Sequence, residues 1–374
     1  MATRLVICLD GTTNRPRSAE THVQRIFRVV ARVPNLQIPY YQPGVGTLVP
    51  HGVYLRSRAL LLKGLDAATA WMLQRHVGSA YHFLMQTWTP GDEVFVFGFS
   101  RGAYAARVLC GMLSSVGLLH TGMDEMLPFA WDEYRQFSKT GQKHNEQTAQ
   151  RNAARFKKRY ARAVPVHFLG LFDTVSSVGT PWRPSTFRRT ATNRDVAIVR
   201  HALALDERRA LFGANLWRGD GRGRQDVQQR WFAGVHGDVG GGYPETEAGL
   251  AKIPLAWMLR EAKAAGLLTD EAREEALFPG SPPDDQGRID DLLLRHAADV
   301  QHESLCGLWK FAEWLPLPRW QLVDGVWRRR WRPHRGRLRH VAADASIDAS
   351  VHERIARLPG YRPGNLPQSG KPPV

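Results

Sequence analysis

Apolar runs recur along this chain at intervals that predict buried strands. Residues 5–9, 93–97, 166–172 and 229–235 are mostly apolar, and a shorter run near residue 40 leads into a glycine-rich loop. Each run ends at a turn of small or polar residues, and segments with helical spacing lie between them. A strand, a helix and a second strand in this order form the βαβ unit of a parallel sheet.

The segments between the runs predict the helices. Apolar residues recur at helical spacing over 20–33 and over 64–88, and further helices are predicted from 101 to about 119 and over 253–266. Residues 201–209 are interpreted as the start of another helix. A charged stretch at about 120–163 also has helical periodicity. We interpret it as a helical insertion over the sheet, either a candidate lid or a plain surface hairpin.

Together these elements predict an α/β fold with a mostly parallel central sheet flanked by helices. A chain of 374 residues suits one large domain with insertions, or two domains at most. We place the main domain at 1–278. A linker rich in proline, aspartate and glycine, 279–287, opens a C-terminal extension, 279–374, that packs on the same domain. The extension is basic and rich in tryptophan, and a flexible tail is expected from about residue 359.

Composition and charge narrow the partners only slightly. The chain has 51 Lys and Arg against 35 Asp and Glu, which gives a net charge of +16. Such a charge favours anionic partners such as lipid headgroups or nucleic acid. The alternative is that these side chains form an ordinary solvated surface. The cysteines Cys8, Cys110 and Cys306 form no closely spaced pair, and the first two are interpreted as small buried apolar residues.

The apolar runs also predict where the chain is made. No run reaches the roughly 18 apolar residues of a membrane span, and the first is too short for the core of a signal peptide. We therefore expect a soluble chain made in the cytoplasm, which leaves the cell only through dedicated machinery.

The run at 93–99 leads into Gly98-Phe99-Ser100-Arg101-Gly102 and then into an alanine-rich helical pattern. Buried strand, sharp turn with serine, and helix are the sequence form of a nucleophile elbow. Glycines flank the serine because strand and helix pass so close that a Cβ would collide, while the serine itself has strained backbone geometry. The G-x-S-x-G pattern also occurs by chance, and its position between strand and helix favours the catalytic interpretation.

Two other strands also end at residues suited to catalysis. Asp173 follows the run at 166–172, and His236 follows the run at 229–235. Since the carboxyl ends of parallel strands share one edge of a sheet, these side chains can converge with Ser100. Their order, serine then aspartate then histidine, is that of α/β-hydrolases. We therefore predict Ser100 as nucleophile, His236 as general base and then acid, and Asp173 as orienting carboxylate.

An oxyanion formed at Ser100 needs fixed hydrogen-bond donors. One is predicted to be the backbone N–H of Arg101 at the start of the helix, and the other comes from Gly11 or Thr12 after the first strand. Asp10 is a candidate supporting residue there. Asp10-Gly11-Thr12 also invites comparison with aspartyl phosphatases, but Cys8 stands where their nucleophilic aspartate would be.

Alternatives exist for each member of the predicted triad. Asp173 can be a simple strand-end residue, and Asp238 can serve as the carboxylate or help to hold a cation. His302 and His352, each followed by a glutamate, compete with His236. The glycine-rich loop after His236 can also bind phosphate through its N–H groups. No ligand-spacing motif predicts a metal site, and we expect no cofactor.

Four blocks of residues resemble one known family. They are LDGT at 9–12, FGFSRGAY at 97–104, LGLFDTV at 169–175 and GVHGDVGGGY at 234–243. They look like the α/β-hydrolases called "domain of unknown function 2235", over roughly residues 3 to 265. Catalytic domains of type VI secretion lipase effectors belong to that group. The resemblance implies Ser100, Asp173 and His236 as the triad, hydrolysis of carboxylic esters, and phospholipase A activity.

The resemblance also bears on partners. It implies a lipid or small ester as substrate, with secretion or immunity partners and export by a type VI machine if the protein is an effector. The basic tract at 327–332, WRRRWR, is a candidate anchor at an anionic membrane surface or a solvated strand face. The competing hypothesis is an inactive hydrolase fold acting as a basic membrane- or nucleic-acid-binding protein. No nucleic-acid-binding motif supports the latter.

Overall fold

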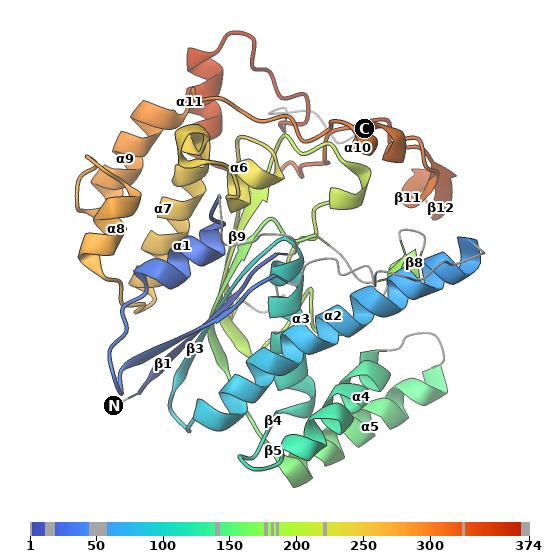
Figure 1. Ribbon diagram of the computed structural model, residues 1–374. Coiled ribbons are helices and arrows are strands. Elements are labelled where there is room, and N and C mark those ends of the chain that lie inside the picture. The colour runs from blue at the N-terminus through green and yellow to red at the C-terminus, as the bar shows by residue number, and fades with distance from the viewer. Residues whose placement is uncertain are drawn as a thin grey trace.

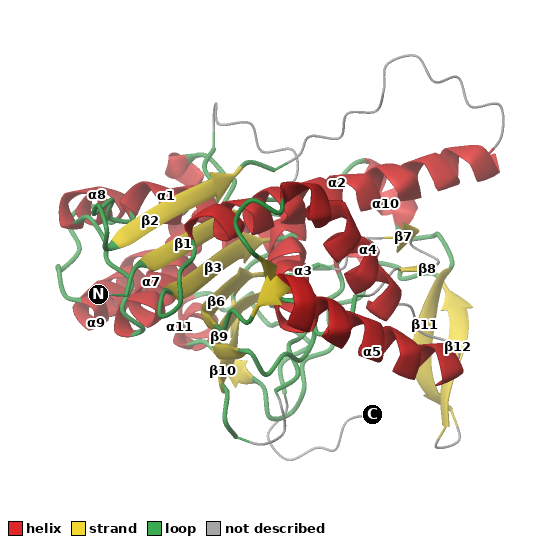
Figure 2. Ribbon diagram, turned by 90° about the horizontal axis from the view of Figure 1, so that it is seen from below, coloured by secondary structure: helices red, strands yellow, loops and turns green. Residues whose placement is uncertain are grey.

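A parallel seven-stranded sheet forms the centre of the molecule (Figures 1 and 2). The computed structural model describes residues 2–11, 19–44, 58–138, 143–175, 179–180, 183–184, 187–219, 223–323 and 326–367. In spatial order the strands are β13 (Ser346–Ile347), β10 (Asp226–Phe232), β9 (Val196–Ala204), β6 (Val166–Phe172), β3 (Glu93–Phe99), β1 (Arg4–Leu9) and β2 (Gln37–Gln42). Every neighbouring pair is parallel, which confirms the predicted fold class.

Within the described residues, three antiparallel ribbons lie outside this sheet. They pair β4 (Leu118–Leu119) with β5 (Ala161–Arg162), β7 (Gly179–Thr180) with β8 (Arg183–Pro184), and β11 (Leu317–Val323) with β12 (Val326–Arg332). The last of these ribbons carries the basic tract at 327–332 on β12.

Helices cover both faces of the sheet because both faces of its strands are apolar. Leu5, Ile7 and Leu9 of β1 belong to one buried cluster, and Val6 and Cys8 belong to a second cluster on the other face. The first cluster is covered by α2 (Arg58–Thr87), α3 (Arg101–Val116), α4 (Leu127–Ser138) and α5 (Lys143–Tyr160). The second is covered by α1 (His22–Val29), α7 (Gly249–Ala264), α8 (Glu271–Leu277), α9 (Asp285–His296) and α11 (Ala349–Arg357) (Figure 1).

The predicted insertion at 120–163 forms a helical hairpin of α4 and α5. Its aromatic side chains Trp131, Tyr134, Phe137 and Phe156 are buried in the same cluster as α2 and α3. The hairpin is therefore part of the helical layer on that face of the sheet. A role as a lid stays a prediction.

The structure corrects one predicted element. Residues 201–204, interpreted as the start of a helix, belong to β9, which lies between β6 and β10 in the sheet. Alanine and leucine in this stretch favour a helix by intrinsic propensity. Pairing on both sides and burial from Val199 to Leu205 override that preference.

The C-terminal extension packs on the main domain. β13 adds an edge strand beside β10, and α11 lies against α9. Residues 359–367, expected to be a flexible tail, are held in place: the Tyr361 hydroxyl donates to Asp206, and the Asn365 amide donates to the carbonyl oxygens of Leu205 and Arg339. The last residues of the predicted tail, 368–374, lie outside the described residues.

Two further observations complete the fold. Cys8 and Cys110 are buried, as predicted, and Cys306 is exposed. Among the described residues, no helix is both long and apolar enough to cross a membrane.

Candidate active site

The carboxyl ends of five parallel strands bring the predicted site residues to one edge of the sheet. β1 ends before Asp10, β3 before Ser100 and β6 before Asp173, while β10 is followed by the turn that leads to His236. β9 ends between β6 and β10 and is followed by Asp206 and Glu207. All of these residues are buried or nearly so.

Ser100 lies at a strained turn between β3 and α3. Its φ is 57° and its ψ is −120°, a backbone conformation that non-glycine residues rarely adopt. A Cβ on Gly98 would lie 2.6 Å from the Cα of Ala103, and one on Gly102 would collide with the carbonyl oxygen of Leu9. The flanking glycines therefore permit the close approach that the motif predicts, and the serine is 9% exposed.

His236 and Asp173 form a hydrogen-bonded pair. His236 Nδ1 lies 2.5 Å from Asp173 Oδ2, and the histidine is the first residue of α6 (His236–Gly240). Because the carboxylate accepts from Nδ1, that nitrogen carries the proton and Nε2 is left to accept one. The rings of Phe99 and Phe212 lie 4.7 and 4.9 Å from the imidazole and fix its plane.

Ser100 is linked to this pair through its chain neighbours. Phe99, which contacts the His236 ring, directly precedes the serine. The Ser100 N–H donates to the carbonyl oxygen of Phe172, the residue before Asp173, at 3.0 Å. The structure therefore places the three predicted triad residues at the same edge of the sheet, after β3, β6 and β10.

Asp173 is fully buried and has positive backbone φ, 40°. Burial alone would raise the pKa of its carboxyl, but the charge of Arg339 and the hydrogen bond from His236 outweigh burial and hold that pKa well below its ordinary range. The carboxyl is thus ionised, as an orienting group for a histidine base must be.

Arg339 is a site residue that the sequence analysis missed. Its guanidinium donates to Asp173 through Nη1 at 2.6 Å and Nη2 at 3.0 Å, although 166 residues separate the two in sequence. It lies in the C-terminal extension within an arginine-rich stretch, and no sequence signal distinguishes it from the neighbouring arginines.

Beneath Asp173 lies a second buried histidine. The His201 imidazole on β9 accepts from the N–H of Thr174 at 3.2 Å and lies 3.4 Å from Arg107. Burial, followed by the charge of Arg107, lowers the pKa of His201 to about 3. This ring is therefore neutral and serves as a fixed support for the turn that carries Asp173.

The predicted oxyanion residues lie beside the serine. Arg101 is the first residue of α3, and its N–H is among the helix N-terminal donors that have no intrahelical partner. A Cβ on Gly11 would lie 3.2 Å from the Cβ of Ser100, so this turn passes close to Ser100. The Gly11 N–H, however, donates to Asp10 Oδ1 at 2.7 Å. Thr12 lies outside the described residues.

Asp10 is anchored by neutral donors. Its carboxylate accepts from the Gly11 N–H at 2.7 Å and from the hydroxyls of Thr21 and Tyr41 at 2.9 Å each. Burial is the largest influence and raises the pKa of Asp10 despite these three hydrogen bonds. Asp10 therefore joins the β1 turn to α1 and β2.

Asp238 and the competing histidines have other partners. Asp238 accepts from the Val235 N–H at 2.9 Å and pairs with His302 Nδ1 at 2.7 Å, while Tyr243 stacks on the His302 ring at 3.4 Å. Asp238 thus fixes the turn that precedes His236. His352 is exposed on α11. Within the described ranges, no group of three or more His, Cys, Asp or Glu residues could hold a metal ion.

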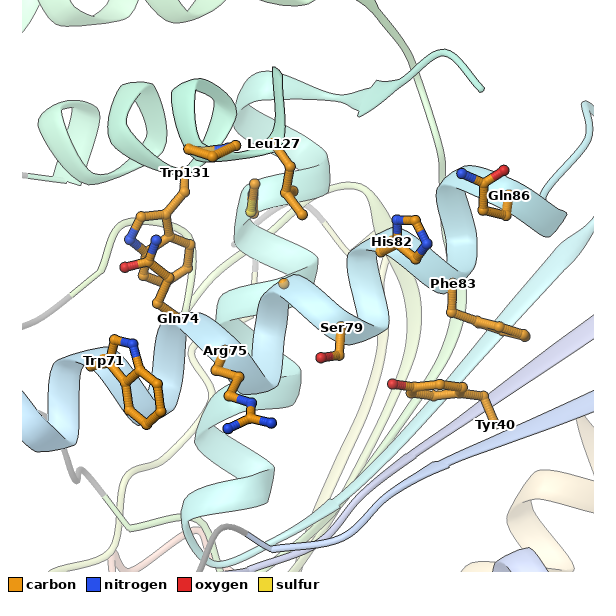
Figure 3. A pocket seen from close by; sticks show the side chains of 13 residues that line it. Tyr40, Trp71, Gln74, Arg75, Ser79, His82, Phe83, Gln86, Leu127 and Trp131 are labelled. Atoms are coloured by element: carbon orange, nitrogen blue, oxygen red, sulfur yellow. The ribbon is translucent and has the colours of Figure 1, made fainter. Parts of the chain in front are cut away.

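One cavity lies away from these residues. It has a volume of about 710 Å³ and lies along α2, between Tyr40 of β2 and Trp131 of α4 (Figure 3). Ser100, Asp173 and His236 are not among the residues that line it. Its position therefore adds nothing to the chemistry of the sheet edge.

A family model covers most of the chain, and three individual proteins are similar to parts of it. The model of the "T6SS, Phospholipase effector Tle1-like, catalytic domain" matches residues 3–261. "Uncharacterized protein YEL023C" of Saccharomyces cerevisiae is 39% identical over 216 residues, 56% of this chain and 32% of that protein. This chain therefore spans about a third of the length of that curated relative.

Two solved structures are also similar. The "Crystal structure of an uncharacterized protein from Pseudomonas aeruginosa" is 19% identical with a TM-score of 0.41, covering 79% of this chain and 50% of that one. The "Structure of the Tle1 effector bound to the VgrG spike from the Type 6 secretion system" is 19% identical with a TM-score of 0.34, covering 65% and 52%. At these scores neither structure supports an argument about function.

Proposed function

The chain belongs to the family of Tle1-like catalytic domains of type VI secretion phospholipase effectors, and from this premise we propose that it hydrolyses phospholipid carboxylic esters through an acyl-enzyme on Ser100. The observation that carries the proposal is the His236–Asp173 hydrogen bond at the same sheet edge as a strained, glycine-flanked serine. Family membership supports lipid hydrolysis, and the site geometry supports the serine mechanism.

Each proton in the proposed reaction has a donor and an acceptor. Ser100 Oγ attacks the ester carbonyl while His236 Nε2 takes the hydroxyl proton, and Asp173 stabilises the imidazolium that forms. The tetrahedral oxyanion lies at the start of α3, where the Arg101 N–H is the first donor. The imidazolium then protonates the leaving alcohol of the lysolipid. A water attacks the acyl-serine by the same route and releases the fatty acid.

The second oxyanion donor is proposed to come from the β1 turn. Gly11 lies close to Ser100, but its N–H donates to Asp10, so it must turn away from that carboxylate to reach an oxyanion. Thr12 is the alternative within the same turn. Removing one such donor from a serine hydrolase costs about 3 kcal/mol in transition-state stabilisation.

Labelling with a fluorophosphonate tests the nucleophile. We expect wild-type protein to be labelled and Ser100→Ala to remain unlabelled. Ser115→Ala is the matched control, because Ser115 lies on α3, the helix that follows Ser100, and its buried hydroxyl has no hydrogen-bond partner within the described part of the chain. Equal labelling of wild type and Ser100→Ala, or none in either, would reject the serine mechanism.

The substrate class needs a separate measurement. Purified protein should release fatty acid and lysolipid from vesicles that contain anionic phospholipid, and Ser100→Ala should not. Hydrolysis confined to short soluble esters would instead indicate an esterase that acts on small substrates. If the wild-type protein binds such vesicles but does not react with the fluorophosphonate, the competing hypothesis of an inactive, basic binding protein is favoured.

Exposed apolar residues at and after α10 (Leu308–Ala312) support contact with a membrane surface. Phe311 lies on α10, Trp314 and Leu315 follow it, and Trp331 lies on β12; each is at least 44% exposed. Arg335 lies over the Trp314 ring at 5.4 Å. The Trp309 ring of α10 contacts Phe212 at 5.3 Å, and Phe212 contacts His236. Aromatic rings with adjacent arginines suit an anionic headgroup layer.

Vesicle cosedimentation tests this surface. The double variant Phe311→Ser with Trp314→Ser should bind anionic vesicles more weakly yet hydrolyse a soluble short-chain ester at the wild-type rate. Leu294→Ser is the control, because Leu294 is 63% exposed on α9, away from α10. Equal vesicle binding by the double variant and wild type would exclude a role for this surface.

Export through a type VI machine, with secretion or immunity partners, also stays a proposal. The family to which the chain belongs supports it. Contact-dependent killing of a competitor by cells that express the wild-type chain, but not Ser100→Ala, is the expected result. Killing that is independent of the type VI apparatus would contradict it.

A further inference from the structure

The carboxylate of the His236–Asp173 pair has a second charged partner from the C-terminal extension. Arg339 lies beyond residue 261, where the family model ends, and donates two hydrogen bonds to Asp173. Both oxygens of the carboxylate are engaged: Oδ1 accepts from Arg339 Nη1 and the Ala204 N–H, and Oδ2 accepts from Arg339 Nη2 and His236.

The guanidinium itself is fixed on its other sides. Arg339 is 7% exposed, and it donates to the carbonyl oxygens of Ala204, at 2.9 Å through Nη1, and of Phe212, at 3.0 Å through Nε. Ala204 is the last residue of β9. The ring of Phe212 packs on His236. One side chain therefore joins the carboxylate, the central sheet and the segment that supports the base.

We propose that Arg339 is a positioning residue of the active site. It orients the Asp173 carboxylate toward His236 Nδ1, and its positive charge partly offsets the negative charge of Asp173 at the imidazole. The inference rests on the proposed serine mechanism. Arg339 does not touch the reacting atoms, and its effect passes through Asp173 to His236.

The geometry gives this role two separable parts. A planar guanidinium that meets both carboxylate oxygens fixes the plane of the carboxylate as well as its position, which a lysine ammonium cannot do. The positive charge also opposes the uptake of a proton by the aspartate–histidine pair. Below the acid limb of the pH profile the imidazole is already protonated and cannot accept the serine proton. Loss of the charge should therefore move that limb to higher pH.

Two variants at Arg339 separate these parts. Arg339→Met removes both the positive charge and the two-point contact with the carboxylate. We expect the acid limb of the kcat/KM profile to move up by about one pH unit, because a charge at this distance has effects of that order. Arg339→Lys keeps the charge, so the limb should stay in place while kcat falls about 100-fold through misalignment, with KM unchanged. Rates are normalised to sites titrated with a fluorophosphonate and measured from about pH 5 to pH 9, where histidines titrate.

Arg354→Met is the matched control. Arg354 is also a buried arginine of the extension, 5% exposed, and it donates to the carbonyl oxygens of Ala297 and Asp299. Its loss should lower thermal stability without moving the acid limb. If Arg339 served only to fasten the extension, Arg339→Met would behave in the same way.

Several results would overturn the proposal. A folded Arg339→Met with the wild-type acid limb excludes the electrostatic role. If Arg339→Met does not fold, Arg339→Lys decides: a raised KM with unchanged kcat indicates a role in substrate binding instead of positioning.

Failure of the proposed function is distinguishable from these outcomes. If wild-type protein has no Ser100-dependent turnover, the serine mechanism fails. The low-field proton NMR signal of His236 Nδ1 then tests the role of Arg339 without relying on activity. That signal should shift in Arg339→Met and remain in Arg354→Met. An unchanged signal in Arg339→Met overturns the inference.

Discussion

Two strands of the central sheet end in a fully buried aspartate, and the two aspartates have opposite properties. Asp10 follows β1, its hydrogen-bond donors among the described residues are neutral, and burial raises its pKa. Asp173 follows β6, and although burial also acts to raise its pKa, Arg339 and His236 lower it. Both side chains are fully buried, and the partners decide in which direction the pKa of each carboxyl moves. A cation contributed from more than 160 residues away makes Asp173 suitable as the carboxylate of a catalytic pair.

Exchanging each carboxyl for an amide should produce the largest contrast. Asp173→Asn is expected to lower kcat about 10⁴-fold, because an amide cannot hold His236 in the tautomer with the proton on Nδ1. Asp10→Asn keeps an oxygen that accepts hydrogen bonds, so kcat should fall about tenfold or less. Steady-state hydrolysis of a soluble ester measures both. Similar losses in the two variants would show that the ends of β1 and β6 contribute equally.

A glycine substitution should disturb the β1 end without touching the Asp173–His236 pair. A Cβ on Gly102 would collide with the backbone of Leu9 and Asp10, and we expect Gly102→Ala to lower the free energy of unfolding by about 3 kcal/mol. Gly78→Ala on α2 is the control, since its nearest contact would be 4.0 Å away and alanine favours a helix. Urea unfolding measures both. Equal stability of the two variants would show that the elbow can relax.

The two aspartates should give opposite pH dependences of stability. The folded-state pKa of Asp173 lies below its ordinary value of 3.8, so its stabilising contribution is present above that pH and is lost as the pH falls through the folded-state pKa. The destabilisation caused by Asp173→Asn should therefore be larger at neutral pH than near pH 3.

For Asp10 the sign is reversed. Its folded-state pKa lies above 3.8, so ionisation of this carboxyl lowers stability as the pH rises through that interval. Asp10→Asn should therefore be less destabilising at neutral pH than near pH 3. Urea midpoints over this range check both signs, and parallel curves for the two variants would contradict the contrast.

The smallest effect should come from a single neutral donor. Tyr41→Phe removes one hydrogen bond to Asp10 Oδ2 and should cost about 1 kcal/mol of stability. Tyr40→Phe, which loses a bond to the side chain of Gln42 in a partly buried position, is the neighbouring control and should cost less. A larger loss from Tyr40→Phe would show that Tyr41 does not anchor the carboxylate.

The strand ends of the site could be predicted because local sequence carries their signal. Continuous apolar runs identified β1, β3, β6 and β10, and the residue types directly after them identified Asp10, Ser100, Asp173 and His236. β9 was not predicted, because its alanines and its leucine favour a helix when neighbouring strands are ignored. Its burial between β6 and β10 supplies the preference for a strand.

The partners of those residues could not be predicted in the same way. His302 was considered as a catalytic base, yet it pairs with Asp238, and Arg339 was one of many arginines in a basic extension. Neither residue lies in a periodic pattern that relates it to a strand end. Their contacts depend on how the extension returns to the sheet through β13 and residues 338–367.

By itself the sequence determined the parallel sheet, the elbow at Ser100 and the set of side chains at the strand ends, because hydrophobic periodicity and glycine spacing are local properties of the chain. Only the tertiary structure decided which carboxyl has a lowered pKa and which histidine meets it. That outcome depends on burial together with charges from residues far apart in sequence, and electrostatic effects of this kind exist only once the chain has folded.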